Sequence, residues 1–269
     1  MKELESRWAL SDLQRTINWC ARRNAQGIRC IIDILGEYAR DELQATSSVE
    51  TYLAAAKAIS DHGLNASLTV KLSALGVLFN REGCRKNVQR IAQEAANLGV
   101  GFEIDMEGQG LVTYAIDVAT ACVEKEYNVS LALQAYLDRT RDDLKRVSAL
   151  GITARIVKGA YVGSIKDFAE IQQRFKELVS VLHARPTFFT VGTHDPEVLE
   201  WTKAQMGAKR DLIEFGFLKG LADLTKIAMA EDGWRVSEYV PFGEGLAAYE
   251  ARRKKYLNEL QKLGRISVP

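Results

Sequence analysis

The feature that most constrains the fold of this chain is a regular alternation of two kinds of segment. Short apolar runs rich in β-branched residues are typical of buried strands, and eight of them recur along the chain. They are IRCIIDIL (28–35), SLTVKLSA (67–74), GFEIDME (101–107), VSLALQAY (129–136), ARIVKGAY (154–161), TFFTVGTH (187–194), LIEFGFL (212–218) and WRVSEYVPF (234–242). Between them lie longer segments with apolar residues three and four positions apart, which indicates helices. This alternation predicts an α/β fold of the (β/α)8 TIM-barrel type.

Two further helices are expected outside this repeat. Residues 4–25 predict an extra helix before the first strand, and residues 247–260 predict a final helix that would lie over the barrel mouth. No linker rich in proline, glycine or serine divides the chain. Because one such barrel needs about 250 residues, we expect residues 1–269 to form a single domain.

Composition and charge limit the partners and the location. The 36 basic and 35 acidic side chains leave a formal charge of +1, so we expect no nucleic-acid partner. Cys20, Cys30, Cys84 and Cys122 show neither a CxxC pair nor metal-ligand spacing, which predicts reduced thiols and no metal site. No apolar run reaches the about 18 residues that span a bilayer, and the first residues lack a signal-peptide core. We therefore expect a cytoplasmic protein, attached at most to the inner face of a membrane.

Polar side chains recur at the carboxyl ends of the expected strands, where the residues of a TIM barrel line the active site. Six of the eight strands carry them. They are Lys71, Asp105, Gln134, Arg155 with Lys158 and Tyr161, Thr193 with His194, and Tyr239. Each has an ordinary explanation, since a strand-end lysine can be solvated and an aspartate can cap the next helix. Their shared location favours a functional site at this face of the barrel.

The final helix carries four consecutive basic residues, a pattern that usually forms a solvated face. Arg252 and Arg253 are adjacent and therefore point about 100° apart, and Tyr249 lies one turn before Arg252. If this helix covers the barrel mouth, two guanidinium groups could bind one carboxylate through paired hydrogen bonds.

Several of these segments belong to motifs that resemble the FAD-dependent proline dehydrogenases, in the order of that family and across residues 66–260. The most specific pieces are R-x-VKGAY and the final Y-x-x-RR. The motifs are VKLSALG (70–76), FEIDMEG (102–108), LQAYLDR (133–139), RIVKGAY (155–161), VGTHD (191–195), EFGFLKG (214–220), YVPFG (239–243) and YEARRKKYL (249–257).

The resemblance implies a barrel that holds FAD noncovalently and oxidises L-proline to Δ1-pyrroline-5-carboxylate, with electrons passed to a quinone. It implies that Arg252, Arg253 and Lys71 bind the proline carboxylate, and that Asp105 is the active-site aspartate beside them. The resemblance assigns further residues to the walls and to the cofactor. These are Tyr239, Tyr249 and Leu218 around the proline ring, Gln134, Arg155, Lys158, Gly159, Ala160 and Tyr161 on the flavin side, and Thr193 with His194 at the adenosine part of FAD.

The resemblance also bears on specificity and partners. Tyr239 stands where hydroxyproline-oxidising relatives have a smaller residue, which implies proline as the substrate. The chain is too short for the extra domains of the bifunctional proline utilization proteins. This implies a monofunctional enzyme for the first step of proline catabolism, with a separate pyrroline-5-carboxylate dehydrogenase as pathway partner and a peripheral membrane contact. Two positions depart from the family: Val162 replaces a common tryptophan, and Tyr256 replaces a common glutamate.

Two other functions stay open at this point. A lysine-dependent aldolase on the same barrel would use Lys71 or Lys158 to form a Schiff base. A barrel that kept its fold without turnover would serve as a binding or scaffold protein. A visible flavin spectrum that L-proline bleaches would separate the oxidase from both.

Overall fold

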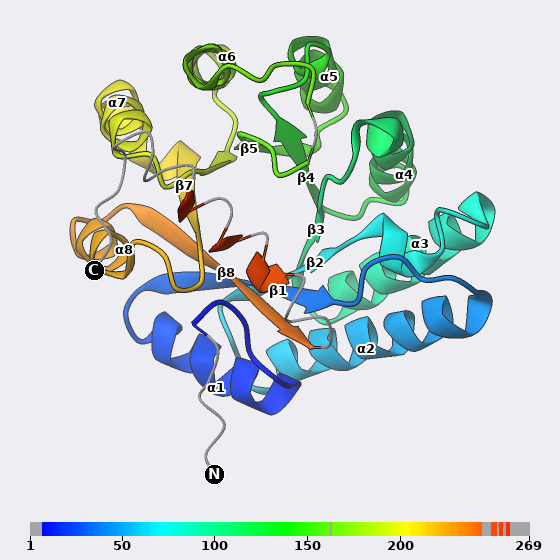
Figure 1. Ribbon diagram of the computed structural model, residues 1–269. Coiled ribbons are helices and arrows are strands. Elements are labelled where there is room, and N and C mark those ends of the chain that lie inside the picture. Colours follow the sequence, from blue (N-terminus) through cyan, green and yellow to red (C-terminus); the bar gives the residue numbers. More distant parts are fainter. Residues whose placement is uncertain (1–6, 162, 244–248, 252, 255–256, 259–269) are drawn as a thin grey trace.

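The computed structural model describes residues 7–161, 163–243, 249–251, 253–254 and 257–258. Eight parallel strands close into a barrel in sequence order, with β1 hydrogen-bonded to both β2 and β8 (Figure 1). They are β1 Ile28–Leu35, β2 Ala66–Val70, β3 Gly101–Ile104, β4 Val129–Gln134, β5 Thr153–Val157, β6 Phe189–Gly192, β7 Ile213–Leu218 and β8 Arg235–Gly243. The (β/α)8 fold expected from the alternation of segments is therefore confirmed.

Helices surround this barrel, as Figure 1 shows. The α-helices are α1 Leu13–Asn24, α2 Glu42–Asp61, α3 Arg81–Asn97, α4 Val112–Val123, α5 Thr140–Ala149, α6 Phe168–His183, α7 Pro196–Met206 and α8 Asp223–Glu231. Short 3-10 helices are η1 Leu72–Leu75, η2 Gln109–Leu111 and η3 Gly207–Leu212. None of the helices in the described part of the chain has the length and apolar character needed to cross a membrane.

The N-terminal helix is shorter than the sequence suggests. Helix α1 covers Leu13–Asn24, so the expected helix over 4–25 is wrong for residues 7–12. The side chain of Asp12 accepts a backbone hydrogen bond from the first turn and thereby caps the helix at this point. Before it, Leu10 forms a parallel bridge with β8. The apolar residues in this stretch serve the edge of the barrel mouth and not a helix face.

Helix α1 occupies the outside of the barrel between β8 and β1 (Figure 1). Its anchor is Glu238, which points outward from β8 and is fully buried. Glu238 accepts hydrogen bonds from Trp19 (2.6 Å) and Arg23 (3.2 Å) on α1, and it forms an ion pair with Lys226 of α8. Removing one partner of such a buried pair costs about 3–5 kcal/mol, so this cluster fixes both neighbouring helices.

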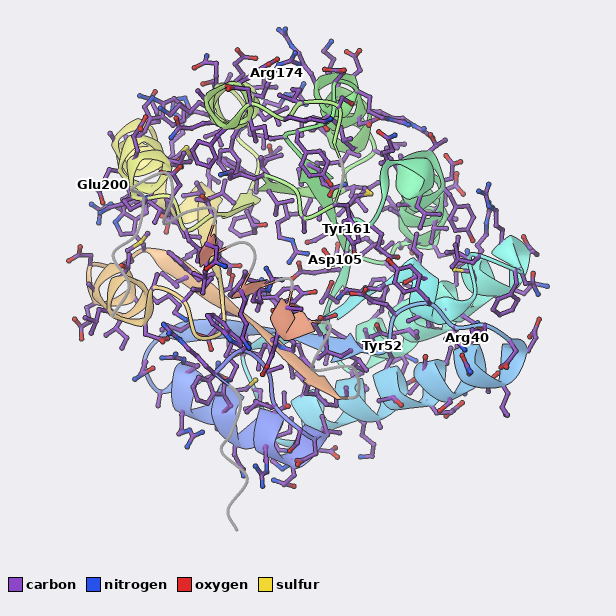
Figure 2. All side chains as sticks on the ribbon, in the orientation of Figure 1. Arg40, Tyr52, Asp105, Tyr161, Arg174 and Glu200 are labelled. Atoms are coloured by element: carbon purple, nitrogen blue, oxygen red, sulfur yellow. The ribbon has the colours of Figure 1, made fainter. Side chains whose placement is uncertain are left out.

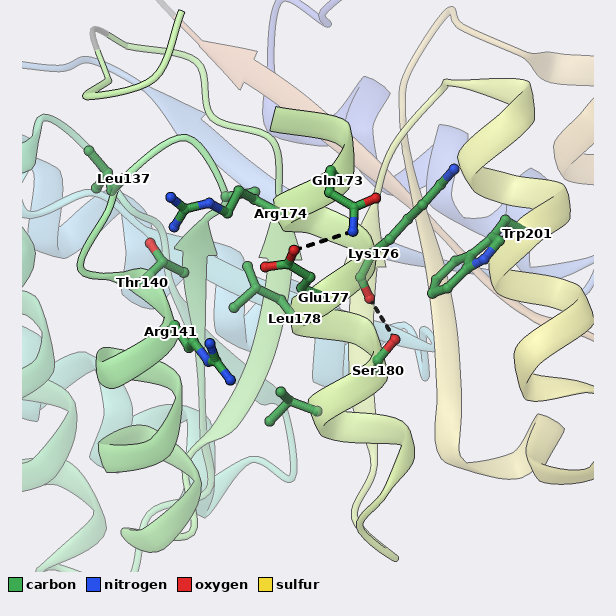
Figure 3. A pocket seen from close by; sticks show the side chains of 12 residues that line it. Leu137, Thr140, Arg141, Gln173, Arg174, Lys176, Glu177, Leu178, Ser180 and Trp201 are labelled. Carbon is green, nitrogen blue, oxygen red and sulfur yellow. Dashed lines mark hydrogen bonds between the residues drawn. The ribbon is translucent and has the colours of Figure 1, made fainter. Parts of the chain in front are cut away.

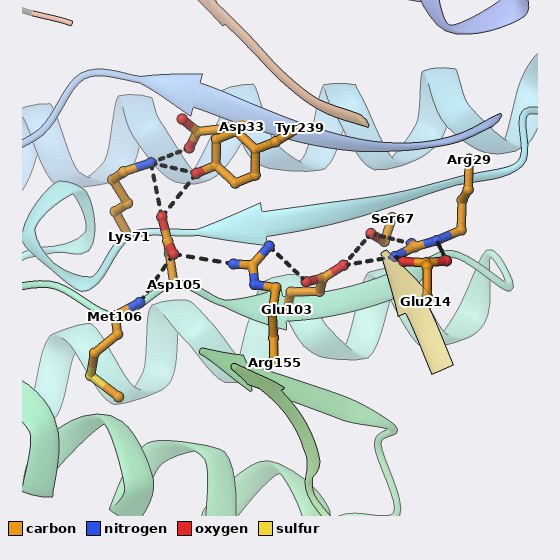
Figure 4. A network of polar contacts seen from close by, with 10 residues as sticks. All are labelled: Arg29, Asp33, Ser67, Lys71, Glu103, Asp105, Met106, Arg155, Glu214 and Tyr239. Atoms are coloured by element: carbon orange, nitrogen blue, oxygen red, sulfur yellow. Dashed lines mark hydrogen bonds and ion pairs between the residues drawn. The ribbon is translucent and has the colours of Figure 1, made fainter. Parts of the chain in front are cut away.

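The interior of the barrel contains a layer of charged side chains below the mouth. Arg29, Glu103, Arg155 and Glu214 lie on β1, β3, β5 and β7, and their side chains contact one another inside the barrel. Asp33 and Asp105 share the inner face of β1 and of the β3 end with them, because side chains an even number of positions apart on a strand point to the same side. Arg29 donates to both oxygens of Glu214, at 2.8 and 2.7 Å, and lies 3.4 Å from Glu103. Glu103 in turn pairs with Arg155 at 3.2 Å (Figure 4). Most TIM barrels fill this space with branched apolar residues, so a charged layer here indicates a role in supporting the site at the barrel mouth.

The described parts of the final segment, 249–251, 253–254 and 257–258, are helical. Figure 1 shows them in red over the middle of the barrel, as expected. Tyr249 is buried against Trp8 and Ala9, so the N-terminal segment packs beside this helix. Three positions singled out in the sequence, Val162, Arg252 and Tyr256, lie outside the described residues.

Candidate active site

A cavity of about 430 Å³ opens at the carboxyl ends of the strands. Most of the residues predicted for the site line it together. They are Lys71, Asp105, Gln134, Arg155, Lys158, Gly159, Ala160, Tyr161, His194, Leu218, Tyr239, Tyr249 and Arg253. Figure 2 shows Asp105 and Tyr161 near the barrel centre, whereas Arg40, Arg174 and Glu200 lie at the periphery. Barrel closure thus gathers side chains from most of the sequence into one site.

A larger cavity, about 770 Å³, lies outside the barrel between α5 and α6 (Figure 3). None of the predicted site residues lines it. Two of the cations that line it already have carboxylate neighbours: Lys176 pairs with Glu197 at 2.8 Å, and Arg174 lies 3.7 Å from both Asp138 and Glu170. We place the chemistry in the smaller cavity, because that one combines buried charges with a closed barrel floor.

Lys71 is the hub of the cavity floor. Its ammonium group forms an ion pair with Asp33 on β1, donates to the hydroxyl of Tyr239 on β8 at 3.0 Å and lies 3.5 Å from Asp105. The Tyr239 hydroxyl donates to Asp105 at 2.9 Å (Figure 4). These four side chains come from or directly follow β1, β2, β3 and β8, so the cluster exists only because the barrel closes.

The ionisation of this cluster is fixed by its own contacts. Burial opposes the charge of Lys71, but the carboxylates of Asp33 and Asp105 and the nearby Tyr239 outweigh it and raise the pKa of Lys71 well above its usual value. Burial would raise the pKa of Asp105, but Lys71, Arg155 and the bond from Tyr239 leave that pKa lowered. The floor therefore carries a protonated lysine and an ionised aspartate at neutral pH.

Arg155 is held between two carboxylates. It lies 3.1 Å from Asp105 above and 3.2 Å from Glu103 below, and is itself buried. Burial opposes its charge, yet Glu103 and Asp105 keep its pKa raised. Ser67 and Arg29 bind Glu103 from the other side, at 2.6 and 3.4 Å. The deep charged layer thus continues directly into the site and fixes the direction in which Arg155 points.

His194 faces the cavity as a neutral ring. The backbone N–H of Leu218 donates to its Nε2 at 2.9 Å, so this nitrogen carries no proton. Burial, together with the positive charges of Arg253, Lys226 and Lys158, lowers the pKa of His194 from 6.5 to about 3. The ring is therefore an acceptor that holds the end of β7, and it cannot serve as an acid at ordinary pH.

Thr193 does not line the cavity. It is buried, and its hydroxyl accepts a hydrogen bond from the backbone N–H of Asp195 at 3.2 Å. Asp195 in turn caps α7, which starts at Pro196 as the Asp-Pro pair predicts. The assignment of Thr193 to the cofactor stays a prediction, and its described contacts belong to the start of the helix.

The roof of the site comes from the final helix. The Arg253 guanidinium lies 4.6 Å from the centre of the Tyr249 ring, and both side chains line the cavity. Burial raises the pKa of Tyr249, against the effect of Arg253. A cation at the roof lies opposite the charged floor, with Leu218 and Tyr239 also lining the space between them.

The segment after β5 forms the wall of the cavity where a cofactor would bind. Lys158, Gly159, Ala160 and Tyr161 follow β5 and line one side of the cavity. Of the residues that the structure describes, Arg155 keeps a buried Nε and Asp33 a buried Oδ2 without a protein hydrogen-bond partner. Buried polar atoms are normally paired, so a ligand with both donors and acceptors would satisfy them. FAD with an amino acid substrate has these groups.

The sequence reasoning missed two residues that the structure places at the centre of the site. Asp33 binds Lys71, and Glu103 binds Arg155. The signal was present, because each is an acidic residue inside an apolar strand run, IIDIL and GFEIDME. A buried carboxylate needs a cation, but the sequence alone does not show which cation, because the partner lies on another strand.

One protein family and several of its curated members match nearly the whole chain. Residues 16–257 match the Proline dehydrogenase family. Proline dehydrogenase 2 of Bacillus subtilis is 27% identical over 250 residues, which cover 90% of this chain and 82% of that protein. Proline dehydrogenase of Deinococcus radiodurans is 27% identical over 239 residues, covering 84% of this chain and 77% of that one.

Solved structures of proline utilization A (PutA) share the fold. The chain from Bdellovibrio bacteriovorus, inactivated by N-propargylglycine, aligns with a TM-score of 0.81 at 19% identity over 90% of this chain. A Bradyrhizobium japonicum PutA variant aligns with a TM-score of 0.76 at 25% identity over 84% of this chain. The present chain spans only 31% and 28% of those two chains, so it matches one part of each.

Proposed function

The chain belongs to the proline dehydrogenase family, and from this premise we propose that it oxidises L-proline to Δ1-pyrroline-5-carboxylate by hydride transfer to bound FAD. Electrons would then pass to a quinone. The observation that carries the proposal is the pairing of an arginine roof with a floor of Lys71, Asp105 and Tyr239 in one buried cavity. A small zwitterionic substrate fits such a site, because it brings one carboxylate and one amine.

In this proposal the substrate carboxylate binds to the roof. Arg253 is the described cation there, and its neighbour Arg252 would join it from outside the described residues. Lys71 already faces two carboxylates and a phenol, so its charge is largely compensated. We assign to Lys71 the task of holding Tyr239 and Asp105 in place, with a weaker contribution to the carboxylate than its motif position suggests.

Orientation is the main contribution that these residues make. Leu218 and Tyr239 confine the proline ring from the sides, and His194 fixes Leu218 through its backbone. Bound FAD would supply the hydride acceptor, and holding the reacting atoms about 3–3.5 Å apart accounts for much of the rate in such reactions. Arg155 lines the same cavity as a permanent positive charge, which favours any negative charge that develops next to it.

The proton on the substrate amine must leave before or during oxidation, because the nitrogen lone pair assists loss of hydride. The described floor has no neutral lysine to take it, since Lys71 stays protonated. We propose that the amine reaches the site already deprotonated or loses its proton to water. The pH dependence of proline oxidation would then come from the substrate amine and not from the residues of the floor.

The same ionisation disfavours a Schiff-base aldolase. An amine that attacks a carbonyl must be neutral, whereas the ion pair with Asp33 and the contact with Asp105 raise the pKa of Lys71. A scaffold protein without turnover would have no need for this buried charge arrangement, whose desolvation is costly. Both alternatives make different predictions from the oxidase in the experiment below.

The deciding experiment uses the purified full chain. It should show a visible flavin spectrum that L-proline bleaches without oxygen and that a quinone restores. In R253A the KM for proline should rise about tenfold or more, because a charge-assisted hydrogen bond contributes about 1.5–3 kcal/mol. The exposed Lys254 on the same helix provides the matched control, since K254A should leave the KM unchanged. A colourless protein that borohydride couples to a carbonyl substrate would contradict the proposal.

Three further assignments belong to this proposal. Residues 1–269 would act as one domain, which the single closed barrel supports. A peripheral membrane contact would bring the site close to a membrane quinone. A pyrroline-5-carboxylate dehydrogenase would consume the product. Vesicle co-sedimentation and coupled turnover with that second enzyme would test the last two.

A further inference from the structure

Tyr136, in the turn after β4, has no assigned role but lies behind the cofactor side of the cavity. Its side chain is buried, with 4% of its surface exposed. The backbone of Tyr136 is tied to the segment after β5: its N–H donates to Lys158 at 3.1 Å, and its carbonyl accepts from Ile165 at 3.0 Å. We call residues 158–161 and 163–165 the post-β5 loop. This loop contains four of the R-x-VKGAY motif residues that line the cavity, Lys158, Gly159, Ala160 and Tyr161.

Two glycines of the post-β5 loop pass directly along the Tyr136 ring. A Cβ atom added to Gly159 would lie 1.6 Å from the ring, and one added to Gly163 would lie 2.1 Å from its other edge. Real Cβ contacts do not approach so closely, so both positions require glycine as long as the ring is there. Gly159 also has a φ of +122°, which disfavours other residues. The loop is therefore shaped around the ring of Tyr136.

The Tyr136 hydroxyl links the loop to Gln134 in a chain of hydrogen bonds with one possible direction. Gln134 Nε2 lies 3.0 Å from the backbone carbonyl of Glu107, which can only accept, so the amide nitrogen must face that carbonyl. Its Oε1 then faces the Tyr136 hydroxyl at 2.7 Å, and the hydroxyl must donate. The hydroxyl in turn accepts from the backbone N–H of Tyr161 at 3.0 Å.

From this geometry we infer that Tyr136 is a positioning residue for the cofactor side of the site. It sets the path of the post-β5 loop, and it fixes the Gln134 amide so that the second N–H of Gln134 is the group left to meet a ligand acceptor. Burial raises the pKa of Tyr136, which keeps the hydroxyl protonated and able to donate. The inference rests on the proposed function only because it names FAD as the ligand whose binding Tyr136 would strengthen.

The test compares Y136F with wild type, and with Y127F as the matched control. Y136F keeps the ring between the glycines and removes only the hydroxyl. Tyr127 lies before β4, at the opposite end of that strand, and is half-buried. Loss of two hydrogen bonds predicts about a tenfold or larger rise in the Kd of the apoprotein for FAD. Without any cofactor, amide exchange in a peptide covering 158–165 should quicken about tenfold.

A second pair of variants keeps the inference testable if Y136F fails to fold. G163A needs no unusual backbone conformation, because Gly163 does not adopt a positive φ, and the three atoms nearest to the added methyl group all belong to Tyr136. It should also weaken FAD binding and speed exchange in the loop. In a Q134L background the effect of Y136F should shrink, since part of its action runs through the amide.

The outcomes separate the inference from the proposed function. Wild-type FAD affinity and loop exchange in both Y136F and G163A would overturn the inference, and strict additivity of Q134L with Y136F would overturn the assigned amide orientation. A wild-type protein that binds no FAD would overturn the proposed function instead, while the exchange comparison would still judge whether Tyr136 orders the loop.

Discussion

Replacement of His194 by glutamine should flatten the pH dependence of stability, because this histidine is buried without charge. Its pKa falls from 6.5 to about 3 in the folded chain. Since the folded pKa lies below the unfolded value, the stabilisation is complete above pH 6.5 and is lost as the pH falls towards 3. Between about pH 7 and about pH 5 the unfolded chain gains a proton that the folded chain does not, which costs about 2 kcal/mol.

Glutamine is the appropriate replacement, because its side-chain oxygen can accept the Leu218 N–H bond that Nε2 now accepts, and it does not titrate. Urea unfolding at the two pH values gives the free energy of unfolding for each variant. We expect wild type to lose about 2 kcal/mol more than H194Q between them. H62Q, at an exposed helix end, is the control and should behave as wild type. Equal losses in wild type and H194Q would refute the neutral, buried histidine.

Three further results are expected. D33N removes one of the two carboxylate charges that stabilise buried Lys71, so unfolding should become easier by about 3 kcal/mol. D41N, at an exposed helix cap where asparagine serves equally, should unfold in urea as wild type does. Y239F removes the hydroxyl that joins Lys71 to Asp105 and should lower kcat/KM for proline about tenfold in steady-state assays. An unchanged kcat/KM would show that the ring of Tyr239 acts only as a wall. Reduction of the enzyme by proline in stopped flow should quicken from neutral to mildly alkaline pH, because more of the substrate amine is deprotonated there. The raised pKa of Lys71 and the lowered pKa of Asp105 keep the charges of the site constant over this range. A flat profile would contradict a dependence on the substrate amine.

Strand identity was accessible from the sequence because it depends on local pattern. The run IRCIIDIL reads as a strand whatever surrounds it, and the observed β1 has the same bounds. The apolar run SLTVKLSA extends beyond its strand, since β2 stops at Val70 and the 3-10 helix η1 begins at Leu72. Apolar residues continue past the strand because the turn is buried as well, so burial alone could not mark the end.

The N-terminal segment shows a different limit. Its spacing of apolar residues resembles a helix, yet Trp8 and Leu10 are buried because the chain runs along β8 and packs near Tyr249. The partner strand is more than two hundred residues away in sequence, so no local pattern could reveal it. Only the capping aspartate, Asp12, marked the true start of the helix.

The sequence by itself determined the order of strands and helices, and it marked Lys71, Asp105, Arg155 and Tyr239 as polar groups at strand ends. Those properties follow from the two periodicities of secondary structure, which are local. The tertiary structure decided which charges meet. Pairing of β1 with β2 places Asp33 against Lys71. Barrel closure adds Tyr239 of β8 to Lys71 and Asp105, because β1 and β8 become neighbours only when the sheet closes.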